Sequence, residues 1–183
     1  APPTNPLIPD TVIQALHDMA DHLPVIMKVY LEVKNPWDIK ISKCNSLLIS
    51  EYLEGSSNNK GIELFNLAPY DTIDLSTYKI CIYSNGSQIP TQQIPLQGKL
   101  PGKGFYILAN NNSSTLSRLV SYADTFTTKI NFNGNDAVAL LKNDTVVDVI
   151  GEIGVDPGLG WVIDTGSTKD HTIIRKPQFK KPF

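Results

Sequence analysis

Residues 47–66 read LLISEYLEGSSNNKGIELFN, two short apolar stretches separated by a polar turn. In the second stretch Ile62 and Leu64 alternate with Glu63 and Phe65, the two-residue period of a strand with one buried face. Residues 47–52 form a comparable apolar stretch, and the Gly, Ser and Asn residues between the two are typical turn formers. This part of the chain therefore predicts two short β-strands that are neighbours in one sheet.

Similar short stretches recur further along the chain. They are bounded by Gly, Pro and Asn, and they cover residues 78–84, 89–96, 105–109, 136–141, 146–150 and 171–175. Pro90 and Pro95 place one of them at a sheet edge. Asn85-Gly86 predicts a hairpin turn, and residues 114–122 predict a short helical turn. Seven or eight short strands in about 130 residues predict a mainly β fold of two packed antiparallel sheets.

Composition limits the function. The 183 residues carry 16 Lys and Arg against 18 Asp and Glu, a formal net charge of −2. This balance does not support general electrostatic binding to nucleic acid. No apolar run reaches the roughly 18 residues that a membrane helix needs, so no membrane span is expected. The length suits one domain of ordinary size with an additional arm.

The first 43 residues follow a different pattern and predict an arm of one short helix and one strand. Asp10 is placed to cap a helix that ends near Met19. In residues 25–33 every odd position is apolar, while Lys28 and Glu32 lie on the other side, as in a half-buried strand. Such a strand is not stable alone in water. It either joins the sandwich or belongs to a sheet missing from this chain, and an uncovered strand would favour a dimer through edge pairing.

The chain has two cysteines, Cys44 and Cys81, which are too few for a disulfide scaffold and too widely spaced for a zinc knuckle or a redox pair. Two interpretations stay open. The cysteines are two independent buried thiols, or they form a single bridge between neighbouring strands, which requires Cα atoms within about 7 Å of each other.

Four segments occur in an order that resembles the bacterial lamin-tail domain. They are ISEYLEGSSNNKGIELFN at 49–66, IDLSTY at 73–78, FNGNDAVAL at 132–140 and VDVIG at 147–151. The resemblance covers residues 44–177 and implies an immunoglobulin-like antiparallel β-sandwich, followed by a basic tail at 178–183. In bacteria such domains are typically appended to secreted nucleases, phosphatases and related hydrolases. The resemblance implies that the domain itself binds or attaches.

A second, shorter stretch is ADHLPV at residues 20–25. It resembles the final Ser-Asp-His-x-Pro motif of the endonuclease/exonuclease/phosphatase superfamily, which the last core strand follows, with Ala20 in place of Ser. The resemblance implies catalytic roles, Asp21 lying beside the metal and His22 contacting the scissile phosphate and helping to activate water. It also implies magnesium or manganese for the parent catalytic domain.

The superfamily's upstream acidic and asparagine residues have no candidates in the nine residues before Asp10. A magnesium-dependent hydrolase needs several oxygen ligands to hold its cation. We therefore expect residues 1–43 to be the end of a catalytic domain plus a linker, the chain to be a C-terminal fragment, and the chain alone to be inactive.

The polar turn offers a candidate ligand-binding set, Glu54, Ser56, Asn58, Asn59 and Lys60, because such loops adapt to ligands. The alternative is a tight connection whose Asn and Gly residues serve the backbone.

Five acidic residues allow a second pair of interpretations: Glu51, Glu54, Glu63, Asp136 and Asp148. Some of them could hold calcium, although no spaced calcium loop is present. The alternative is that they are outward residues of strands and turns, or that Glu51 and Glu63 bond to loop backbone. No metal site is predicted for the chain.

The basic tail likewise has two interpretations, contact with a phosphate backbone or a charged end that aids solubility.

Together these observations predict a non-catalytic accessory module for binding or attachment in a secreted bacterial metal-dependent phosphodiesterase or nuclease. The expected location is secreted or at the cell surface. The expected partners are the upstream catalytic domain and a cell-surface component, a protein or nucleic acid. The rival hypothesis is a complete structural or adhesive surface protein with no enzymatic link.

Overall fold

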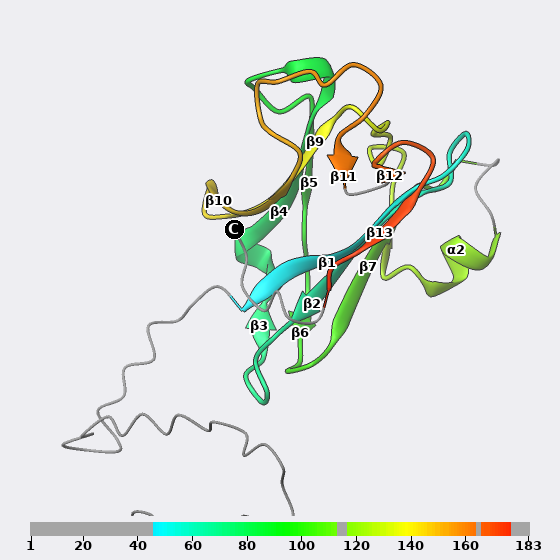
Figure 1. The fold of residues 1–183 in the computed structure, drawn as a ribbon. Helices are drawn as coiled ribbons and strands as arrows, with labels where there is room; N and C mark the ends of the chain where they lie inside the picture. The colour runs from blue at the N-terminus through cyan, green and yellow to red at the C-terminus, as the bar shows by residue number, and fades with distance from the viewer. Residues whose placement is uncertain (1–45, 113–116, 164–165, 177–183) are drawn as a thin grey trace, which may run out of the picture. The chain divides into compact units, whose positions relative to one another are not determined.

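The computed structural model describes residues 46–112, 117–163 and 166–176 (Figure 1). The predicted helix and strand of the N-terminal arm, and with them Asp21, His22 and Cys44, lie outside the described residues, as does the tail from residue 177. The predictions made for those segments stay predictions.

The quoted stretch of sequence forms the first hairpin of a five-stranded sheet, as predicted. Its strand order is β13-β1-β2-β7-β8, with all pairs antiparallel except β7 and β8. The strands are β1 (Leu47–Glu54), β2 (Lys60–Asn66), β7 (Phe105–Ala109), β8 (Thr125–Phe126) and β13 (Thr172–Ile174). A register shift between Ile49 and Glu51 marks a bulge in β1.

The second sheet has four antiparallel strands in the order β10-β9-β4-β5. Its strands are β4 (Tyr78–Tyr83), β5 (Gln92–Pro95), β9 (Ala137–Lys142) and β10 (Thr145–Ile150). Strands β9 and β10 are joined through Asn143 and Asp144, which have φ of 45° and 63°, as a tight hairpin requires. Strand β5 lies at the edge, as the prolines of this region predicted.

Smaller elements complete the fold. They are the strand pairs β3 (Ile73–Asp74) with β6 (Lys99–Leu100) and β11 (Val162–Ile163) with β12 (Gly166–Ser167), the 3-10 turns η1 (Leu75–Thr77) and η2 (Ser84–Gly86), and the helix α2 (Ser117–Tyr122). The sequence did not predict the two small strand pairs or β8. Within the described ranges, no helix has the length and apolar character to cross a bilayer.

The hairpin predicted at Asn85-Gly86 is correct in conformation and wrong in length. Both residues have positive φ, 53° and 75°, but strand β5 starts only at Gln92. The reason is tertiary, because Asp136 accepts a hydrogen bond from the Asn85 N–H at 2.9 Å. A Cβ on Gly86 would come within 2.9 Å of the backbone nitrogen of Asp156. The turn is thus held against two other loops.

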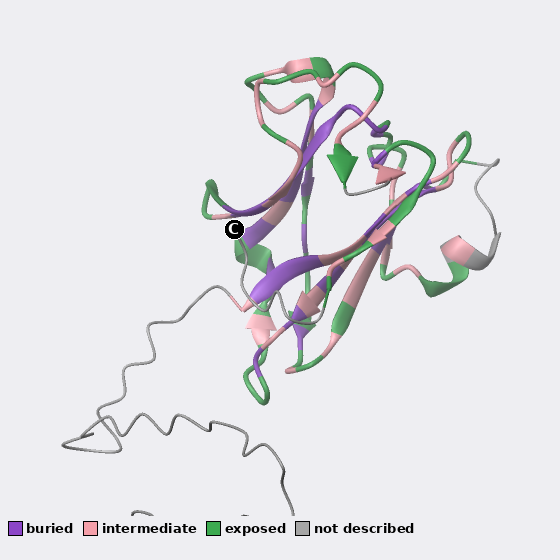
Figure 2. Ribbon diagram, viewed as in Figure 1, coloured by how far each residue is buried: buried purple, intermediate pink, exposed green. Residues whose placement is uncertain are grey.

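The hydrophobic core lies between the two sheets. Alternate residues of each sheet point inward, and Figure 2 shows the buried positions running along the strands. On β1 and β2 the inward residues include Tyr52, Ile62 and Leu64, and the Tyr52 ring stacks on Phe132 with centroids 4.7 Å apart. This arrangement confirms the predicted mainly β sandwich of antiparallel sheets, and it agrees with an immunoglobulin-like fold.

A second buried cluster lies on the other face of the four-stranded sheet. Small side chains, Cys81, Ala137 and Ala139, are covered together with Tyr83 and Leu141. Cys81 is a free, buried thiol, and burial raises its pKa above the usual value. Burial of Cys81 agrees with one of the two interpretations of the cysteines, while Cys44 lies outside the described residues.

Candidate functional site

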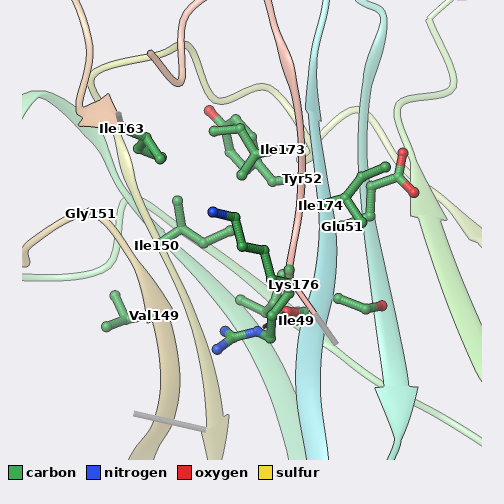
Figure 3. A pocket seen from close by; sticks show the side chains of 12 residues that line it. Ile49, Glu51, Tyr52, Val149, Ile150, Gly151, Ile163, Ile173, Ile174 and Lys176 are labelled. Atoms are coloured by element: carbon green, nitrogen blue, oxygen red, sulfur yellow. Dashed lines mark hydrogen bonds between the residues drawn. The ribbon is translucent and has the colours of Figure 1, made fainter. Parts of the chain in front are cut away.

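An apolar groove of about 610 Å³ opens where the edges of the two sheets meet (Figure 3). One wall comes from β1 and β13 and the other from β10 and β11. The residues that line it are Ile49, Ser50, Glu51, Tyr52, Val149, Ile150, Gly151, Ile163, Ile173, Ile174, Arg175 and Lys176. Six of these twelve residues are aliphatic, so the groove offers an apolar surface with charged groups at a few points.

The position of the groove follows from the topology. Strand β13 is an edge strand of the five-stranded sheet, and β10 is an edge strand of the four-stranded sheet. The two sheet edges therefore flank one opening. An edge strand presents backbone N–H and C=O groups on its outer side. Side chains such as Ile150, Ile163 and Ile173 line the space between these edges. An extended apolar segment suits such a site, because it can use both the backbone groups and the side-chain surface.

A buried ion pair links the two walls of the groove. Asp148 of β10 is fully buried and accepts two bonds from Arg175 Nη2, at 2.8 Å and 2.7 Å. The Arg175 side chain is 12% exposed. Asp148 Oδ2 also accepts the backbone N–H of Ile49 at 2.8 Å, and Arg175 Nε donates to the Ile49 carbonyl at 2.9 Å. The two charged side chains therefore hydrogen-bond the N–H and C=O groups of Ile49, a residue of β1 that is not paired with β13.

One side of the groove depends on a glycine. Gly151 has φ of +83°, and a Cβ at this position would come within 2.5 Å of Trp161 Nε1. Within the described part of the chain, this indole nitrogen is buried with no hydrogen-bond partner. The Trp161 backbone N–H donates to Thr168 Oγ1 at 2.8 Å. The tryptophan is thus held against the chain just after β10, next to the groove.

The structure places the predicted ligand-binding loop at the β1–β2 connection. Lys60 forms a buried ion pair with Glu54, and its ammonium also donates to the Gly55 carbonyl at 2.6 Å. Glu54 further accepts the backbone N–H of Asp170. The charged ends of the loop are therefore directed inward and bonded to other parts of the protein.

The polar tip of the same loop stays at the surface. Asn59 Nδ2 donates to the Ser56 carbonyl at 3.0 Å, Ser56 is exposed, and Asn58 is half-buried. These contacts are those expected of a tight connection. Ligand binding by the five loop residues stays a prediction.

In the part of the chain that the structure describes, the candidate acidic side chains do not gather at one place. Asp136 accepts backbone N–H groups of Asn85 and Asn133 at 2.9 Å and 3.0 Å, and Asp148 belongs to the ion pair described above. Glu51 and Glu63 are direct cross-strand partners; the sequence predicted that their strands are neighbours but not this register. Among the described residues, no three His, Cys, Asp or Glu side chains converge to hold a metal. That part of the chain therefore offers no set that fits the implied magnesium or manganese.

The sequence alone did not reveal the groove or its ion pair. Asp148 interrupts the apolar run VVDVI at 146–150, and an acidic residue within such a strand is a signal of a buried partner. Its partners, Arg175 and Ile49, are 27 and 99 residues away in sequence. The local pattern therefore could not identify them.

Comparison with known families gives one match. The family model described as Lamin Tail Domain matches residues 41–154. No curated protein matches the chain. The matched region includes β1 to β10 and ends before β13, so it contains Asp148 but not Arg175.

Proposed function

We propose a function from the premise that the chain belongs to the lamin tail domain family. The chain is the non-catalytic, immunoglobulin-like accessory module of a secreted bacterial metal-dependent phosphodiesterase or nuclease. It attaches the parent enzyme to a cell-surface component or to another protein. Its ligand occupies the apolar groove between the sheet edges.

The groove is the observation that carries this proposal. It combines an apolar surface with backbone edges on both sides, and rigid strands form most of its walls. Binding sites in proteins are typically apolar hollows with a few polar groups that fix the ligand's orientation. Here Lys176 supplies a cationic group at one wall, since the Arg175 guanidinium is paired with Asp148, and Figure 3 shows the Lys176 side chain extending along the groove.

The link to hydrolysis rests on the short resemblance around Asp21 and His22. In the proposed parent protein these two residues complete a catalytic centre whose other residues belong to an upstream domain. That domain uses magnesium or manganese and cleaves phosphodiester or phosphomonoester bonds. The described residues take no part in this chemistry, and their contribution is to hold the enzyme near its substrate.

The proposal is tested with the fluorescently labelled chain of 183 residues and a groove variant. Binding to intact cells of the source bacterium and to its isolated cell envelope is measured by sedimentation. The chain should bind saturably, and Ile150→Lys should weaken binding at least 10-fold, because it introduces a charge into the groove. Val146→Lys, a change at a 40% exposed residue of the same strand outside the groove lining, is the matched control. Equal binding by both variants would refute the groove as the site.

A second measurement tests the absence of catalysis. The full chain is incubated with magnesium or manganese and with either DNA or bis(p-nitrophenyl) phosphate. No turnover is expected. Robust turnover that His22→Ala abolishes would refute a non-catalytic role. The product of the whole gene should hydrolyse the small phosphodiester, and deletion of residues 46–176 should release it from cells without loss of this turnover. A gene product without turnover would favour a structural or adhesive surface protein.

A further inference from the structure

The outer face of the five-stranded sheet carries a row of four paired residues. Ile174 of β13 pairs with Glu51 of β1, Glu51 with Glu63 of β2, and Glu63 with Ile107 of β7. Successive side chains of a strand point to opposite faces. Since the adjacent Tyr52, Ile62 and Leu108 point into the core, the row of four points away from it. Two carboxylates therefore face each other between two isoleucines.

The surroundings of this pair are apolar. A second groove, of about 330 Å³, lies beside it. Leu53 of β1, Ile107 of β7, and Leu119 and Tyr122 of α2 supply its apolar side chains, and Glu51 and Glu63 are its acidic members. Tyr122 is 69% exposed and Ile174 is 68% exposed. This face of the sheet thus leaves large apolar side chains in solvent on both sides of the carboxylates.

No cation offsets the two carboxylates within the described residues. The ion pairs there join Lys60 to Glu54, Lys79 to Asp144 and Arg175 to Asp148, and none includes this pair. Like charges directly opposite on neighbouring strands destabilise a sheet.

Hydrogen bonding offsets the repulsion only in part. Glu63 accepts the Ser50 hydroxyl at 2.6 Å. The pKa of Glu51 is raised, first by burial and then by the charge of Glu63. The free protein therefore carries an unfavourable arrangement that a cation from outside would relieve.

We infer that this face docks an extended segment of a partner protein that carries Lys or Arg between apolar residues. The basic side chain lies between Glu51 and Glu63, and its apolar neighbours cover Ile107, Leu53 and the α2 side chains. Neighbouring strands lie roughly 4.8 Å apart, so the row of four spans about 14 Å. Four or five extended residues cover that distance. The surface is distinct from the groove between the sheet edges, although Glu51 and Ile174 also line that groove, and the inference does not depend on the link to hydrolases.

The test is a selection of random heptapeptides displayed on phage against the immobilised full chain. Counter-selection uses the double variant E51Q/E63Q, in which the amide oxygen introduced at position 63 still accepts the Ser50 hydroxyl. Glu152→Gln removes one negative charge at an exposed residue of the loop after β10 and serves as the control. Urea denaturation of every variant verifies that it is folded.

The selected peptides should carry Lys or Arg flanked by apolar residues. Their affinity should fall at least 10-fold for E51Q/E63Q and stay within 2-fold for Glu152→Gln. In ¹⁵N spectra of the full chain, they should shift the amides of Glu51, Glu63 and Ile107. Peptides that bind both proteins equally, or that lack basic residues, would overturn the inference. So would a dimer of the chain that E51Q/E63Q dissociates, or saturable shifts of the same amides with Ca²⁺ alone.

Discussion

Removal of the Arg175 guanidinium should destabilise the sandwich strongly. Asp148 is fully buried, and Arg175 is its cationic partner. Arg175→Met keeps much of the side-chain volume but removes the two bonds to Asp148 and the bond to the Ile49 carbonyl. Breaking a buried pair in this way costs about 3–5 kcal/mol, because one charge is left uncompensated in the interior. A domain of this size has a free energy of unfolding of about 5–15 kcal/mol, so this loss should be a large and measurable fraction of the total.

Urea denaturation of the full chain, followed by far-UV circular dichroism, measures this loss. Urea is preferred to guanidinium because it leaves charge interactions unscreened. The sharper test is the second substitution. Adding Asp148→Asn to Arg175→Met removes the uncompensated charge and leaves an acceptor for the Ile49 N–H, so it should recover about 1–3 kcal/mol. Lys79→Met, at a surface pair whose Asp144 partner is 83% exposed, should barely move the midpoint. A further loss of stability from Asp148→Asn in the Arg175→Met background would show that the buried Asp148 charge is not what destabilises the single variant.

Three further substitutions test other parts of the argument. Gly151→Ala should lower the free energy of unfolding by about 1–3 kcal/mol more than Gly158→Ala. Both glycines have φ above +80°, but only at Gly151 would an added Cβ clash with the Trp161 indole, and equal losses would contradict this. Lys60→Met should lower the free energy of unfolding by about 3 kcal/mol or more in urea denaturation, because it leaves Glu54 buried without its cation, whereas an unchanged midpoint would contradict a stabilising role for this buried pair. Glu51→Gln should stabilise the protein at pH 7 by less than about 1 kcal/mol. The raised pKa of Glu51 means that the folded state binds its proton more tightly, so ionisation weakens the fold as pH rises through that pKa. The gain should vanish below the ordinary pKa of 4.5, and a gain that persists at pH 3 would argue against charge repulsion.

Local patterns in the sequence predicted the strands well. The alternation of Ile62 and Leu64 with Glu63 and Phe65 is a property of adjacent residues, and it correctly separated core from outer face. The same local reasoning correctly made the strands of Glu51 and Glu63 neighbours, since one short turn joins them. The two-residue turn at Asn143 and Asp144 also follows from local conformational preference.

The side chains that build the candidate sites were harder to predict. Lys60 and Glu54 belong to a polar loop that the sequence left open as a ligand-binding set or a tight connection, and the sequence did not predict that they pair with each other in the interior. The dipeptide Asn85-Gly86 has the expected φ values but does not close a short hairpin, because the loop is bonded to Asp136, 51 residues away. In both cases the deciding partner is set by packing.

Local sequence patterns were enough to predict short antiparallel strands with one apolar face, and the packing of these faces into a sandwich. Periodicity and turn chemistry act over a few residues, so they can be read directly. Three features are visible in the folded protein alone: the position of the sheet edges, the ion pair of Asp148 and Arg175 that joins them across the groove, and the absence, in the described part of the chain, of a cation beside Glu51 and Glu63. These features depend on which distant residues burial brings together, and burial is a property of the whole fold.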